Sequence, residues 1–188
     1  MRRIFDGYAR FFSSVDLDEY RALAGGQRPH SLVITCSDSR IVPEELFDAR
    51  PGELFVLRNV GNLARLDEPS VAAALDYALL HLGVKNVVVL AHTDCGAVKA
   101  SKNVDHLDTD GLKRWLGNEF FEGVDSEEAG KAAGLRQLRR VEQYPLFKKM
   151  ADEGSVSASL LFFHIDTCAL EVYEDGVWSV PERLAVSK

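Results

Sequence analysis

Short apolar runs that alternate with helical patterns are the feature that most constrains the fold of this chain. Three runs rich in β-branched and aliphatic residues cover positions 31–36, 54–57 and 86–91, and a helical pattern follows each of them. Such runs predict strands buried on both faces, and strands that alternate with helices form a mostly parallel sheet. Two further strand patterns occur at 159–165 and 170–173. The sequence therefore predicts an α/β fold in which helices flank a mostly parallel central sheet of about five strands.

The length, composition and net charge of the chain limit its domain organisation and its possible partners. Its 188 residues, 46% of them hydrophobic and 27% charged, suit a globular protein with one sizeable core. We expect a single domain over residues 1–188, with an N-terminal helical arm at 1–26 and an α/β core at 27–188. The net charge of -7 argues against partners that require a basic face, so we expect neither nucleic-acid nor membrane binding. No apolar run approaches the roughly 20 residues that span a bilayer.

The cysteine content indicates a reducing compartment. The chain has three cysteines, which is too few, and an odd number, for a disulfide framework. Its first residues also lack the pattern of a secretory signal. We therefore expect a cytoplasmic protein.

An aromatic face marks the first helix that the sequence predicts. Apolar side chains recur at helical spacing across residues 3–13, at Ile4, Phe5, Tyr8, Phe11 and Phe12. A second short helix is expected at 16–24, where Asp16 and Glu19 form a capping-box pattern. Such an arm packs either on its own domain or on a partner subunit, and the pattern leaves both open.

Metal-binding side chains follow two of the expected strands. Cys36 stands at the end of the first strand, and His92 and Cys95 follow the third. The carboxyl ends of parallel strands share one edge of the sheet, which is where the sites of α/β proteins lie. A thiol, an imidazole and a second thiol form a donor set typical of zinc. The sequence therefore predicts a zinc site formed by Cys36, His92 and Cys95.

A carboxylate and a guanidinium follow the first thiol at alternate positions. Asp38 and Arg40 are close enough for a charge-assisted, bidentate pair that fixes the orientation of the carboxylate. Three protein ligands leave an open position for water or for Asp38, which is typical of catalytic rather than structural zinc. The alternative is that Cys36 is a nucleophile with His92 as its base, and this alternative leaves Cys95 without a role.

Two motifs in this order resemble those of the β-class carbonic anhydrases. The family's Cys-x-Asp-x-Arg element stands at residues 36–40, and its His-x-x-Cys element stands at 92–95. Between them, 51–56 and 58–62 match the family's intervening pattern, whereas 101–134 follows the family only loosely. The resemblance implies an α/β fold, a Zn²⁺ cofactor, and the reversible hydration of carbon dioxide to bicarbonate and a proton.

The resemblance also implies a substrate pocket and an assembly. Gln27 corresponds to a glutamine that reaches the active site across the family's dimer interface, so we expect a homodimer or a tetramer. The N-terminal helices would then pack on the partner subunit. By the same resemblance, Phe55, Val60, Gly61 and Tyr77 would line the apolar pocket for carbon dioxide.

Roles for the paired motif residues follow from the same family. Asp38 would accept a hydrogen bond from the reacting water, and Arg40 would hold Asp38 off the metal. In a closed state, Asp38 would become the fourth ligand. Two other functions fit the same chain: hydrolysis of carbon disulfide or a related heteroallene, and a non-catalytic zinc-binding role in assembly. The intact Asp38 and Arg40 argue against the second of these.

Overall fold

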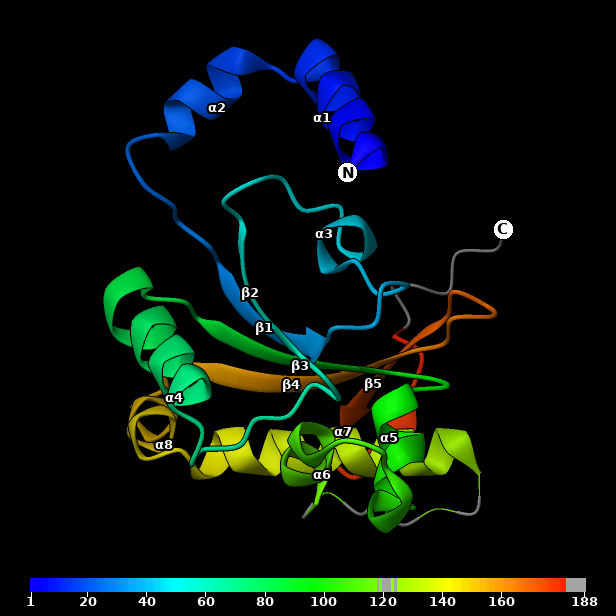
Figure 1. The fold of residues 1–188 in the computed structure, drawn as a ribbon. Helices are drawn as coiled ribbons and strands as arrows, with labels where there is room; N and C mark the ends of the chain where they lie inside the picture. Colours follow the sequence, from blue (N-terminus) through cyan, green and yellow to red (C-terminus); the bar gives the residue numbers. More distant parts are fainter. Residues whose placement is uncertain (118, 120–122, 124, 182–188) are drawn as a thin grey trace.

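A computed structural model describes residues 1–117, 119, 123 and 125–181 and shows a sheet flanked by helices (Figure 1). In the described part of the chain, the sheet has six strands in the order β2-β1-β3-β4-β5-β6. The strands are β1 (Ser31–Cys36), β2 (Leu54–Asn59), β3 (Asn86–His92), β4 (Ser157–Phe163), β5 (Leu170–Glu174) and β6 (Val177–Ser179). The first four in this order run parallel, and β5 and β6 are antiparallel. The predicted α/β class and mostly parallel sheet are confirmed; β6, only three residues long, was not predicted.

The central strands β1 and β3 bring the expected metal ligands to one edge of the sheet. All six residues of β1 are buried, because helices or loops cover both faces of a mostly parallel sheet. The pairing of β1 with β2 places Cys36 opposite Asn59, and the pairing of β3 with β4 places His92 opposite Phe163. Since β1 and β3 are themselves parallel neighbours, their carboxyl ends lie side by side, as the sequence predicts.

Helices cover the sheet unequally (Figure 1). One face is covered by α4 (Pro69–Asp76), α7 (Ser126–Gln143) and α8 (Pro145–Asp152), and the short α3 (Pro43–Leu46) lies on the other face. The helix predicted after the second strand is α4 followed by a π-helical segment, η1 (Tyr77–Leu82). α5 (Gly96–Ser101) packs beside α7, and α6 (Asp110–Leu116) contacts α5 and the 3-10 turn η2 (Val104–His106). None of the helices in the described ranges is long and apolar enough to cross a membrane.

The helix α7 begins earlier than its apolar pattern indicates. Side chains at helical spacing indicate helix across residues 135–142, whereas α7 already starts at Ser126 behind an N-cap formed by the Asp125 side chain. The first half of α7 buries only small residues, so it lacks the periodic large side chains that reveal a helix. These small residues let α7 lie directly against β3 and β4: a Cβ atom added at Gly130 would come 3.3 Å from the His92 carbonyl oxygen.

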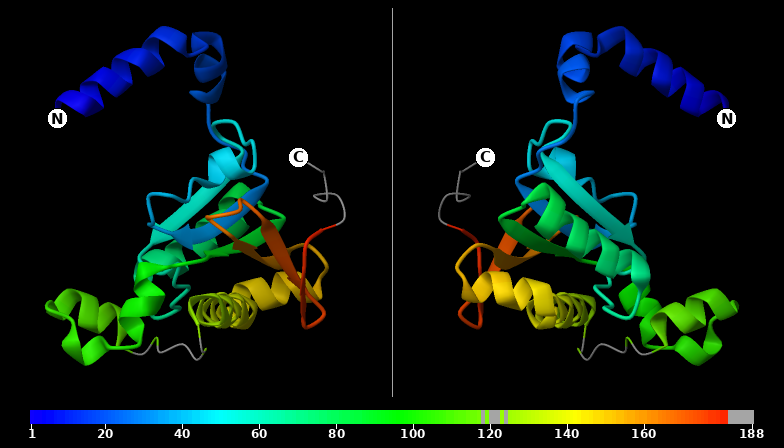
Figure 2. Two further views of the ribbon diagram at one scale, coloured as in Figure 1. Left: turned by 90° about the vertical axis from the view of Figure 1, so that its right-hand side faces the viewer. Right: turned by 90° about the vertical axis from the view of Figure 1, so that its left-hand side faces the viewer.

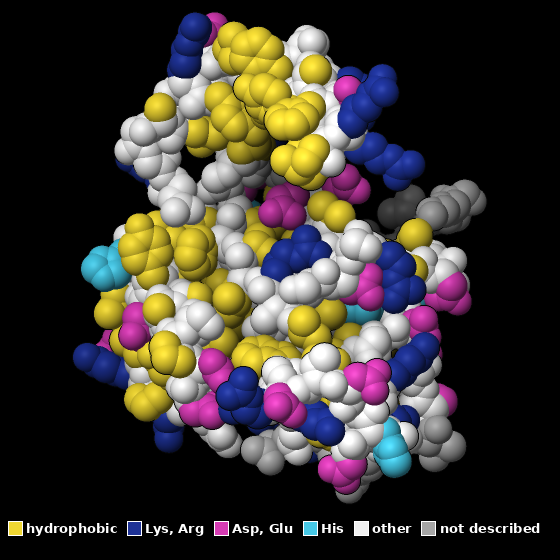
Figure 3. All heavy atoms as spheres, viewed as in Figure 1, with side chains coloured by type: hydrophobic (Ala, Val, Ile, Leu, Met, Phe, Trp, Pro, Cys, Tyr) yellow, Lys and Arg dark blue, Asp and Glu magenta, His cyan; other side chains and the backbone are white. Residues whose placement is uncertain are grey.

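The N-terminal arm consists of α1 (Arg2–Ser14) and α2 (Leu17–Leu23) and projects from the body of the protein (Figures 1 and 2). Neither helix buries a residue against its own chain. The aromatic side chains predicted to share one face are exposed, and they form the apolar area at the top of Figure 3. The chain therefore leaves the aromatic face of its own arm uncovered.

Candidate metal centre

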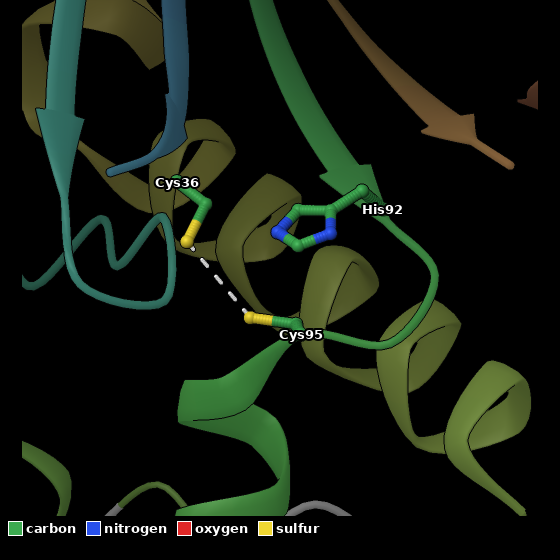
Figure 4. Close-up of side chains that lie close together, drawn as sticks. All are labelled: Cys36, His92 and Cys95. Carbon is green, nitrogen blue, oxygen red and sulfur yellow. Dashed lines mark hydrogen bonds between the residues drawn. The ribbon is translucent and has the colours of Figure 1, made fainter. Parts of the chain in front are cut away.

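The three predicted metal ligands meet in a buried cluster (Figure 4). Cys36 ends β1 and His92 ends β3, while Cys95 follows a short turn and precedes α5. Asp94 in that turn has a φ of 61°, a left-handed conformation that Asp tolerates better than most residues. The donor atoms of all three ligands lie within 4.8 Å of one another.

Hydrogen bonding fixes which nitrogen of His92 faces the thiols. Nδ1 lies 2.8 Å from the Thr93 carbonyl oxygen, and because a carbonyl only accepts, Nδ1 carries the proton. The lone pair is then on Nε2, which is buried and has no hydrogen-bond partner among the described residues. The peptide of Thr93 is itself held, since its N–H donates to the Phe163 carbonyl at 3.0 Å. A buried acceptor without a hydrogen bond lowers the stability of the fold, and a metal ion bound to the Nε2 lone pair would remove this penalty.

The two thiols share a proton. The hydrogen bond from Cys95 is the largest of the effects that lower the pKa of Cys36, while burial acts in the opposite direction. The pKa of Cys95 is raised, because its proton is held by the Cys36 sulfur and because burial disfavours a second charge. The cluster thus accommodates one negative charge readily and resists another. A dication would allow both sulfurs to ionise.

The spacing of the sulfurs fits a tetrahedral zinc ion. Zn–S bonds of about 2.3 Å at tetrahedral angles place two sulfur ligands about 3.8 Å apart. The sulfurs of Cys36 and Cys95 are 3.9 Å apart, too far for a disulfide, which needs about 2.05 Å. Both cysteines are free. The donor atoms, the tautomer of His92 and the distance between the two sulfurs therefore all fit a zinc ion.

Asp38 and Arg40 form a bidentate pair beside this cluster. Arg40 donates from Nε to Oδ1 at 2.9 Å and from Nη2 to Oδ2 at 2.8 Å, and its backbone N–H reaches Oδ1 at 3.0 Å. These bonds hold the pKa of Asp38 well below its usual range, and the same partner raises the pKa of Arg40. Arg40 also lies 3.7 Å from the Asp94 carboxylate. The carboxylate of Asp38 is thus ionised and fixed in orientation.

Arg58 is a positioning residue to which the sequence pattern assigned no role. Its Nε donates to the Cys36 carbonyl at 3.2 Å, and its Nη2 donates to the carbonyls of Asp38 and Ile41, each at 2.8 Å. One side chain from β2 therefore supports the backbone between the first thiol and the carboxylate pair. The signal for this role that the sequence offers is an arginine at the penultimate position of a strand.

The predicted pocket residues fall into two groups. Val60 and Gly61 lie in the loop after β2, next to Asn59, which pairs with Cys36. Phe55, however, pairs with Leu32, four residues before Cys36 and so about 13 Å away at ~3.3 Å per residue.

The second group lies at the amino end of the sheet. The rings of Phe55 and Tyr77 are 5.8 Å apart, and exposed Gln27 precedes β1. The structure therefore brings Val60 and Gly61 to the metal cluster, but it does not bring Gln27, Phe55 or Tyr77 there within one chain.

A second group of potential metal ligands is already neutralised. Glu127, His164 and Glu171 lie close enough to hold an ion. The ammonium group of Lys131, however, stands 2.8 Å from Glu127 and 2.6 Å from Glu171, and His164 is 2.7 Å from Glu171. This group is an ion-pair network and separate from the metal cluster.

Comparisons with known proteins agree with this geometry. The family model described as carbonic anhydrase matches residues 31–170. A carbonic anhydrase of Pseudomonas aeruginosa is 33% identical over 193 residues, which cover 93% of this chain and 88% of the relative. One from Synechocystis is 29% identical, covering 94% of this chain and 72% of the relative.

Solved structures give the same result. The β-carbonic anhydrase CcaA superposes with a TM-score of 0.89 at 27% identity, covering 97% of this chain and 92% of the other. A tetrameric β-carbonic anhydrase from Sordaria macrospora shares the fold, with a TM-score of 0.75 at 24% identity over 95% of this chain and 94% of the other. The chain therefore belongs to the carbonic anhydrase family, with the fold of the β class, and is an enzyme of that kind.

Proposed function

We propose that this protein catalyses the zinc-dependent, reversible hydration of carbon dioxide to bicarbonate and a proton. Cys36, His92 and Cys95 would hold one ion per chain. The observation that carries the proposal is the buried Nε2 of His92, which has no hydrogen-bond partner in the described part of the chain and faces two thiols at a separation that fits zinc. Zinc, when bound, acidifies a water molecule and so supplies a nucleophile near neutral pH.

The Asp38–Arg40 pair would orient the reacting water. An ionised carboxylate beside the cluster accepts a hydrogen bond from that water and directs a lone pair toward the carbon of the substrate. Because Arg40 binds both oxygens of Asp38, it would hold the carboxylate off a bound ion. If this pairing were lost, Asp38 would become a fourth ligand and close the site.

A second copy of the chain would complete the substrate pocket. Val60 and Gly61 lie at the metal end of the sheet, whereas Gln27, Phe55 and Tyr77 lie at the opposite end. A partner related by a two-fold axis would bring its own amino-end residues to this site, as the family resemblance implies for Gln27. This division of one pocket between two ends of a chain supports a homodimer as the active unit, with a tetramer as a further assembly.

The N-terminal arm suits the same assembly. Its aromatic face is exposed within one chain, so we infer that residues 1–26 clasp the partner and residues 27–188 form the core of a single domain. The three free cysteines support a cytoplasmic location.

Stopped-flow hydration of carbon dioxide tests the proposal. Zinc-loaded protein should turn over carbon dioxide, and protein stripped by a chelator should regain activity when zinc is returned. Cys95→Ala should lose both zinc and activity, while Cys168→Ala, at the exposed cysteine, serves as the matched control.

Three results would contradict the proposal. Full zinc occupancy in Cys95→Ala would refute the ligand set. Faster turnover of carbon disulfide than of carbon dioxide would identify a heteroallene hydrolase. Zinc binding without turnover of either compound would indicate a non-catalytic protein.

A further inference from the structure

The helix α6 contacts the loop that carries the metal-side pocket residues. The indole Nε1–H of Trp115 donates to the carbonyl oxygen of Val60 at 2.7 Å. Trp115 belongs to the stretch 101–134, whose sequence follows the family only loosely and for which the motifs imply no role. This contact joins a segment distant in sequence to the peptide between Val60 and Gly61.

The loop is fixed at both ends, and of the residues between them Gly61 and Asn62 are buried whereas Val60 is exposed. Asn59 donates from Nδ2 to the Leu63 carbonyl at 2.8 Å, accepts from the Leu63 N–H at 2.7 Å, and accepts through its carbonyl from Ser37 N–H at 2.9 Å. The Val60 side chain, in contrast, is 44% exposed, so burial does not determine its position. The bond from Trp115 acts on the carbonyl of this one exposed residue.

Trp115 is itself braced by Arg65. The Arg65 guanidinium lies 5.7 Å from the centre of the indole ring, and its Nη1 donates to the Trp115 carbonyl at 3.2 Å. This donation also caps the last turn of α6, where backbone carbonyls lack helical partners. Arg65 is held in turn by Asp67, 2.7 Å away. The indole is therefore a fixed donor.

An apolar hollow lies between α6 and the loop. Its volume is about 410 Å³, and it is lined by Ser37, Asn59, Val60, Gly111, Leu112 and Trp115. Leu112 and Trp115 also pack against the hydrophobic cluster that contains the thiols of Cys36 and Cys95. The hollow thus adjoins the metal cluster and suits a small uncharged molecule.

We propose that Trp115 is a positioning residue that fixes Val60, and with it the metal-side wall of the pocket for carbon dioxide. The proposal rests on the proposed function. The indole N–H holds the Val60 carbonyl, so the Val60 side chain keeps one position beside the bound substrate. Without the N–H, the exposed Val60 side chain samples several positions and the encounter with carbon dioxide becomes less productive.

Two substitutions at one position separate the N–H from the ring. Trp115→Phe removes the donor and keeps an aromatic ring under Arg65, and Trp115→Met removes the donor and the ring. Both should lower kcat/KM for carbon dioxide by about three- to tenfold, the factor expected for one lost neutral hydrogen bond. Since kcat also includes release of the proton to buffer, which Trp115 does not contact, kcat should stay within about twofold. Zinc content should not change.

Trp178→Phe is the matched control. Trp178 is the other tryptophan of the chain, is also half-buried, and packs on Tyr173 in β5, away from α6. It should leave kcat/KM unchanged.

The proposal is overturned if Trp115→Phe keeps the wild-type kcat/KM, or if only Trp115→Met lowers it, because ring volume would then be the cause. It is also overturned if kcat and kcat/KM fall in the same proportion, which reports an inactive fraction. Wild-type protein that does not hydrate carbon dioxide would instead refute the proposed function.

Discussion

Adding a single methyl group at Gly134 should destabilise this protein, although alanine is normally favoured over glycine within a helix. Gly134 lies in α7, where the helix packs on β3 and β4. A Cβ atom at this position would lie 2.9 Å from Leu160 Cδ1 and 3.0 Å from the Cβ atom of Ala91, the residue before His92. The leucine terminus can rotate, but the Cβ atom of Ala91 moves only with β3.

The size of the effect follows from two opposing terms. Alanine gains about 1 kcal/mol over glycine in a helix interior. Overpacking a filled core costs about 1–3 kcal/mol. Gly134→Ala should therefore lower the free energy of unfolding by up to about 2 kcal/mol, and the Tm by up to about 8 °C for a chain of this length. Because β3 must shift, zinc should also be retained less well.

Gly111→Ala is the matched control. Gly111 is likewise helical, in α6, but a Cβ atom there would meet nothing within 4 Å. Its Tm should stay the same or rise. Thermal unfolding at fixed protein and zinc concentrations measures both variants, since both concentrations affect Tm. A Tm for Gly134→Ala at or above that of the wild type would refute the argument that α7 lies too close to β3 for a side chain.

Three further predictions follow from the site and the arm. In metal-free protein, thiolate absorbance should be present at neutral pH and vanish in Cys36→Ser; because the hydrogen bond from Cys95 lowers the pKa of Cys36 below its unfolded value, the stability that Cys36 contributes is present above that unfolded pKa and is lost as the pH falls toward the lowered one. Arg40→Ala and Asp38→Asn should each reduce kcat/KM by roughly 10²-fold. The first variant frees the Asp38 carboxylate, and the second replaces it with an amide, which is a weaker hydrogen-bond acceptor. Near-normal activity of Asp38→Asn would contradict the assigned role. Deletion of residues 1–26 should yield inactive monomers by light scattering, and a fully active monomer would disprove the shared pocket.

The sequence by itself determined the mostly parallel sheet and the residues that meet in the metal cluster. The strand ending at Cys36 is buried on both faces, so its apolar run is continuous and directly readable. His92 and Cys95 follow a similar run, and parallel strands place such ends at one edge whatever the details of packing. The pairing of Asp38 with Arg40 is equally local, because the two residues stand two positions apart.

Only the tertiary structure decided where α7 begins, where Phe55 lies and what Trp115 contacts. The early start of α7 rests on small residues that fit beneath β3, and small residues carry no periodic signal. The separation of Phe55 from the metal cluster follows from strand register, and the bond from Trp115 to Val60 joins residues 55 positions apart. Contacts of this kind depend on how elements pack after they form. Local propensity and spacing, which are all that a single sequence displays, do not encode them.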